Sequence, residues 1–81
     1  MSRLKRILMS NLPLEQTPIS YESLFDKVSS DMSQFGDLID NSDFYRALFD
    51  LKEEQALVFF DGKKHSNVIA TQYGFRIYGT E

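Results

Sequence analysis

A single apolar stripe between Ser20 and Gly36 restricts the possible folds of this chain more than any other part of the sequence. Apolar residues follow one another there at steps of three, one, three, four and three positions, the spacing of one helix face. They are Tyr21, Leu24, Phe25, Val28, Met32 and Phe35. Ser20 can accept a hydrogen bond from a free amide of the first turn, and Gly36 can take the left-handed conformation that ends a helix. The pattern predicts an amphipathic helix with this stripe facing the core.

A shorter apolar repeat precedes the stripe. Leu4, Ile7 and Leu8 recur at helical spacing, which predicts a first helix over about residues 2–11. Pro13 and Pro18 then bracket a connector. The residue before each proline is biased away from the helical conformation, so no helix is expected across this segment. Within this connector, residues 17–19 could form a short strand.

A third helix is predicted after a link over residues 37–41. Asn41 or Ser42 can cap it, and Asp43 suits the positive end of the helix dipole. Its predicted inward face consists of Phe44, Ala47, Leu48 and Leu51.

The C-terminal part predicts a β-hairpin. Residues 56–60, Ala-Leu-Val-Phe-Phe, are typical of a buried strand because β-branched and aromatic residues dominate. An Asp-Gly pair then turns the chain into a polar loop tip, and a second strand is predicted over residues 67–71. Residues 72–78 leave two alternatives: strict alternation would continue the strand, whereas Thr71 could cap a short final helix.

The size and composition of the chain indicate one α+β domain over residues 1–81. Its 42% hydrophobic and 14% aromatic content are enough for a packed core, and the absence of cysteine excludes disulfides and thiolate metal sites. The longest apolar runs are far shorter than the roughly 20 residues that span a bilayer. The basic start is followed by too short an apolar stretch for a signal peptide. We therefore expect a cytoplasmic protein with no membrane partner.

Charge is distributed unevenly behind a net value of −3. Residues 1–10 carry three basic residues and no acidic one. Residues 15–54 carry ten acids against three bases, a net of −7, and residues 55–81 have a net of +1. Basic ends therefore flank an acidic middle, an asymmetry that bears directly on which partners the surface can attract.

The predicted order of elements resembles that of a winged helix-turn-helix domain of the small regulator type. Residues 44–58 look like the third helix of such a domain running into its first wing strand. Residues 68–75, Val-Ile-Ala-Thr-Gln-Tyr-Gly-Phe, look like the second wing strand followed by the Thr-x-x-Gly that often opens a final helix. The resemblance rests on element order and not on a diagnostic motif. It implies a winged-helix-like fold, three helices followed by a two-stranded wing, with double-stranded DNA as the partner.

In that family the third helix usually enters the DNA major groove, and the wing contacts the backbone or the minor groove. The outward positions of the third helix would here be Asp43, Arg46, Asp50, Glu53 and Glu54. Four of these five side chains are acidic, whereas groove readout needs hydrogen-bond donors and cations. The acidic helix therefore favours an alternative in which it docks on a basic partner surface or mimics nucleic acid.

Cations that could grip phosphate occur in three places. The candidates are Lys63, Lys64 and His65 at the loop tip, Arg3, Lys5 and Arg6 at the N-terminus, and Arg46 on the third helix. Binding through them would release counterions and depend on salt. The alternative is that they are ordinary solvated turn and terminal residues.

Tyr45 and Phe49 form a second aromatic strip on the third helix. They lie about 100–140° around the helix from the predicted inward face, further than one small core usually covers. Either they pack under the first helix, or they are exposed and mark a surface for a partner or for a second copy of the chain.

No group of residues indicates catalysis, a cofactor or a metal. His65 is the only histidine and has no companion ligand or nucleophile at a diagnostic spacing. The sequence therefore predicts a small non-enzymatic regulator that binds DNA through a basic wing and N-terminus in the control of transcription; a homodimer would present two such wings. The alternative is a protein-interaction winged helix that acts through its acidic third helix.

Overall fold

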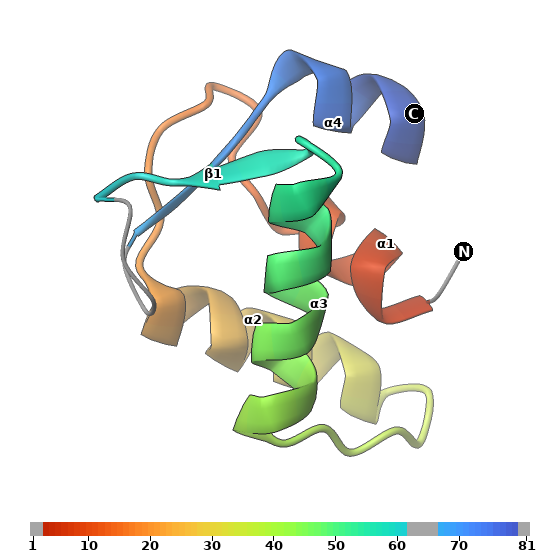
Figure 1. Ribbon diagram of the computed structural model, residues 1–81. Coiled ribbons are helices and arrows are strands. Elements are labelled where there is room, and N and C mark those ends of the chain that lie inside the picture. Colours follow the sequence, from red (N-terminus) through yellow and green to blue (C-terminus); the bar gives the residue numbers. More distant parts are fainter. Residues whose placement is uncertain (1–2, 62–66, 80–81) are drawn as a thin grey trace.

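The structure is a computed structural model that describes residues 3–61 and 67–79 (Figure 1). Its elements are, in chain order, α1 (Arg3–Ser10), α2 (Tyr21–Ser33), α3 (Asn41–Glu53), β1 (Leu57–Phe59), β2 (Val68–Ala70) and α4 (Gln72–Tyr78). Three helices, a two-stranded antiparallel hairpin and a short final helix confirm the predicted α+β arrangement. This order is compatible with a winged-helix topology.

Helix α2 begins as predicted and ends earlier than predicted. The Ser20 side chain accepts a hydrogen bond from the Ser23 amide at 3.1 Å, and Gly36 has the left-handed φ of 81°. The helix stops at Ser33, so Phe35 lies in the turn after it and is 57% exposed. The prediction that Phe35 belongs to the buried stripe is therefore wrong, and its ring lies 4.4 Å from the Arg3 guanidinium instead.

Helix α3 has the predicted inward face but a different cap. Phe44, Ala47, Leu48 and Leu51 are all buried. The N-cap is Asp40 and not Asn41 or Ser42: its carboxylate accepts from the Asp43 amide at 2.8 Å, and the Asp43 side chain accepts from the Asp40 amide. This reciprocal capping box satisfies two amides at once, which a cap at the following positions could not do with Asp43.

The hairpin is shorter than predicted, and a residue of the connector before α2 pairs with its second strand. β1 and β2 pair antiparallel in the register Leu57–Ala70, Val58–Ile69 and Phe59–Val68. The strand predicted over residues 17–19 is reduced to one bridge, in which Ile19 and Val68 exchange backbone hydrogen bonds of 2.9 and 2.8 Å. This bridge ties the connector before α2 to β2.

Residues 72–78 form a helix and not a continued strand. Thr71 is extended and caps the helix, accepting from the Gly74 amide at 2.9 Å while its hydroxyl donates to the Gln55 carbonyl at 2.7 Å. Gly74 then packs directly on Ala56, whose carbonyl oxygen would lie 2.1 Å from a Cβ at position 74. The helix is therefore fixed by a contact with the end of the α3–β1 turn.

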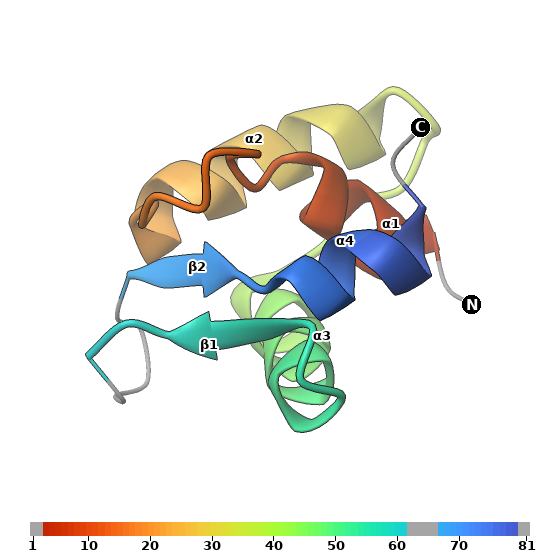
Figure 2. The ribbon, with the colours of Figure 1, turned by 90° about the horizontal axis from the view of Figure 1, so that it is seen from above.

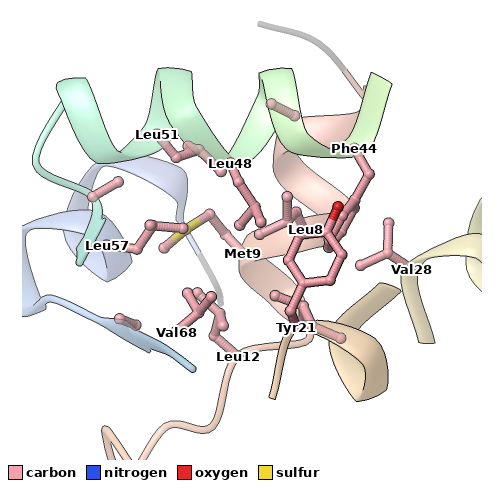
Figure 3. Close-up of a cluster of buried hydrophobic side chains, with 14 of the residues drawn as sticks. Leu8, Met9, Leu12, Tyr21, Val28, Phe44, Leu48, Leu51, Leu57 and Val68 are labelled. Atoms are coloured by element: carbon pink, nitrogen blue, oxygen red, sulfur yellow. The ribbon is translucent and has the colours of Figure 1, made fainter. Parts of the chain in front are cut away.

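The buried apolar side chains of the described residues form one cluster between the helices and the hairpin (Figure 3). Phe44 of α3 occupies one end, where the rings of Tyr21 and Phe25 each approach its ring edge-on at 5.1 Å. At the other end Leu57 of β1 and Val68 of β2 point towards Met9 of α1. Every element except α4 contributes a large buried side chain, and α4 packs the partly buried Phe75 and Tyr78 against the cluster and makes the close Gly74 contact.

We expect Gly74→Ala to destabilise the fold by about 1–3 kcal/mol, because the added methyl group meets backbone atoms that have no rotamer with which to move away. Thermal or urea unfolding measures the effect. Gln72→Ala, at an exposed position of the same helix, is the control and should stay within about 0.5 kcal/mol of the parent. Equal stability of the two variants would contradict the contact.

Candidate functional site

Helix α3 is bordered by a different element on each of its two sides (Figure 1). Leu4 and Lys5 of α1 lie along the side that carries Asp43, Asp50 and, at the helix end, Glu54. Strand β1 lies along the side that carries Tyr45 and Phe49. The helical spacing of 100° per residue separates these two sides and leaves Arg46 and Glu53 pointing away from the core.

All five predicted outward positions of α3 are exposed. Two of them are already used within the fold: Asp43 completes the capping box, and Glu54 follows the helix and binds Lys5. Arg46, Asp50 and Glu53 remain on the exposed polar face of α3, where Glu53 lies 3.8 Å from Lys52, and we call these three residues the α3 outer face. Its net charge is −1.

Two of the three N-terminal cations are directed at carboxylates of the same chain. Arg3 lies 3.2 Å from Asp37, and the Lys5 ammonium lies 2.6 Å from Glu54. Arg6 is exposed and forms no ion pair with a described residue. The fold thus brings the basic start of the chain onto its acidic middle, which reduces the positive field that the N-terminus could offer to a polyanion.

Glu54 is the centre of a contact that joins α1, the end of α3 and α4. Lys5 donates to one carboxylate oxygen at 2.6 Å, and the Tyr78 hydroxyl donates to the other. Hydrogen bonds from Lys5 and then from Tyr78 lower the pKa of Glu54 below its usual 4.5. Burial, followed by the hydrogen bond to Glu54, raises the pKa of Tyr78 to about 12.

Of the two alternatives for the Tyr45–Phe49 strip, packing under the first helix does not describe the contact that Tyr45 makes with Phe59 of β1. Tyr45 is half-buried, and its ring lies 6.3 Å from Phe49 and 6.4 Å from Phe59 of β1. The hairpin therefore supplies the cover, because α1 occupies the opposite side of α3. Phe49 is 42% exposed, and the Lys52 ammonium lies 5.6 Å from its ring centre.

The sequence places Arg3 on the first helix and Glu54 near the end of the third, but it does not pair either of them with its partner. Glu54 and Tyr78 are 24 positions apart, and Arg3 and Asp37 are 34 apart. No periodicity links such positions, since their meeting depends on how three elements pack. The predicted wing-tip residues Lys63, Lys64 and His65 lie outside the described residues.

Within the described residues, no group of three or more acidic, histidine or cysteine side chains is arranged to hold a metal ion. No helix among them is long and apolar enough to cross a bilayer. Comparison of the chain with protein-family models, with curated proteins and with solved structures finds no match.

The lowered pKa of Glu54 gives the Lys5–Glu54 contact a predictable pH dependence. The pKa of Glu54 is lower in the folded protein than in the unfolded chain, so its ionised form stabilises the fold above the usual pKa of 4.5. This stabilisation is lost as the pH falls through the pKa that Glu54 has in the folded protein. Because both side chains are partly exposed, we expect Glu54→Gln to cost about 1 kcal/mol or less at pH 7. Urea unfolding from pH 7 down to about pH 2 should show this difference vanish.

Glu53→Gln is the matched control, since Glu53 lies 3.8 Å from Lys52 in a more exposed pair. We expect it to change stability less than Glu54→Gln at pH 7. A difference between parent and Glu54→Gln that persists unchanged at the lowest pH would contradict the ion-pair origin.

Proposed function

We propose that this domain is a non-enzymatic protein-interaction module with a winged-helix-like fold, and that the α3 outer face docks on a basic partner surface. The observation that supports this most directly is the position of the cations. Arg3 and Lys5 are held against carboxylates, whereas Asp50 and Glu53 face outwards. The net charge of −1 on the α3 outer face favours a cationic partner over phosphate.

The neighbourhood of the α3 outer face adds an apolar contact to the charge. Phe49 is 42% exposed and lies between Asp50 and Lys52 on the helix surface. Aromatic side chains of this kind dominate the binding energy of many interfaces, while acidic groups around them set the orientation and the association rate. The partner that fits is therefore a protein surface with lysine or arginine residues around an apolar centre.

Charge reversal tests this proposal with a matched control. The probe is a fluorescent helical peptide with lysine, arginine and leucine along one face, measured by anisotropy at about 0.15 M salt. We expect Asp50→Lys with Glu53→Lys to weaken binding at least about tenfold, because two attractions become repulsions in the docked complex. Glu22→Lys with Asp26→Lys makes the same change in net charge on the exposed side of α2.

The α2 double variant should bind within about threefold of the parent, since net charge alone acts weakly at this salt concentration. Equal losses in the two double variants would show attraction to overall charge and would contradict docking on α3. Phe49→Ala tests the apolar part of the interface. The affinity lost in this variant should add to the affinity lost by the charge reversal.

DNA binding through the wing is the second candidate, and it is supported by the two lysines and the histidine of the hairpin tip together with exposed Arg6. In this case contacts between the wing and the phosphate backbone of the DNA would supply the affinity. We expect Lys63→Ala with Lys64→Ala to lower the salt slope of duplex binding by about 2, one unit for each lost phosphate contact. Mobility shifts at several salt concentrations measure the slope. Absence of duplex binding by the parent protein at about 50 mM salt would rule this candidate out.

A further inference from the structure

A groove of about 620 Å³ lies away from α3, between α1, the connector after it and the end of α4. Figure 2 shows α1 and α4 side by side, with the turn after α2 beyond them. Tyr78 and Gly79 close the groove at the α4 end. Its volume falls within the range of roughly 300–1,000 Å³ that small-molecule sites occupy in proteins.

Apolar side chains line more than half of the groove surface, beside the polar side chains of α1. Met9 and Leu12 line it and are themselves buried, at 1% and 3% exposure. Leu14 and Phe35 line it as well, yet they are 70% and 57% exposed. Large apolar side chains that border a concavity in this way give a ligand more contact area than they would on a flat surface.

One face of α1 adds positive charge to the apolar surface. Arg3, Arg6, Ile7 and Ser10 follow at helical spacing, and all four line the groove. The Arg3 guanidinium is fixed in place by Phe35 at 4.4 Å and by Asp37 at 3.2 Å. Arg6 forms no ion pair with a described residue, although the chain carries twelve acidic residues.

We propose that this groove binds a small organic carboxylate with an apolar tail. The tail lies on the Met9–Leu12 floor between Leu14 and Phe35, and the carboxylate meets the guanidinium of Arg6. A guanidinium presents two parallel N–H groups that match the two oxygens of a carboxylate, so the charge and the geometry both favour this head group. The site is independent of the α3 outer face, because it uses the opposite side of α1 from Lys5.

Octanoate is the probe, titrated into isotopically labelled protein below its micellar concentration and followed by amide chemical shifts. We expect saturable shifts at Ile7, Leu12, Leu14 and Phe35. Acetate, which lacks the tail, and 1-octanol, which lacks the charge, should each bind at least about tenfold more weakly, since each loses one of the two contributions.

Arg6→Gln should weaken octanoate binding about tenfold, the size of one lost charge-assisted hydrogen bond. Its melting temperature should match that of the parent, because Arg6 is exposed and unpaired among the described residues. Arg46→Gln, which removes the same charge from α3, is the control and should bind like the parent. Absence of saturable shifts with octanoate, equal affinity for 1-octanol, or equal affinity of Arg6→Gln and the parent would each overturn the proposal.

Discussion

The buried face of α3 determines where α1 and β1 lie, and α2, α4 and β2 pack in turn against these two elements. Phe44, Ala47, Leu48 and Leu51 cover only part of the helix circumference, so the two flanks must be closed by other segments. Helix α1 lies along the flank with Asp43, and β1 lies along the flank with Tyr45. The α3 outer face and the outer edge of Phe49 stay exposed and can contact another molecule.

The elements that depend on local sequence were predictable, and those that depend on distant contacts were not. The stripe in α2 and the inward face of α3 follow from helical spacing, which sequence displays directly. Residues 72–78 also alternate as a strand does, and their helix is decided by Thr71 binding the Gln55 carbonyl and by Gly74 lying on Ala56. Neither contact leaves a periodic signal, because its partners are 16 and 18 positions apart.

The uneven charge along the sequence does not become an equally uneven charge on the surface of the folded protein. A basic N-terminus and an acidic middle predicted a positive surface at one end. In the folded protein Lys5 and Arg3 lie against Glu54 and Asp37, so the two regions neutralise one another where they meet. Exposed ion pairs of this kind contribute little stability. Their effect on the surface is larger, because they leave Arg6 as the N-terminal cation without a partner among the described residues.

Helix α1 links the two surfaces through its opposite sides. Lys5 faces α3 and reaches Glu54, while Arg6, the next residue, lines the groove. Tyr78 takes part in both, since its hydroxyl binds Glu54 and its side chain borders the groove. An 8-residue helix has too little buried area to hold its position alone, and only Leu8 and Met9 are buried in it. The position of α1, and with it the shape of the groove, rests on Leu8 and Met9 in the core and on Leu4 and Ile7 packed against it, and the Lys5–Glu54 contact ties this helix to the end of α3.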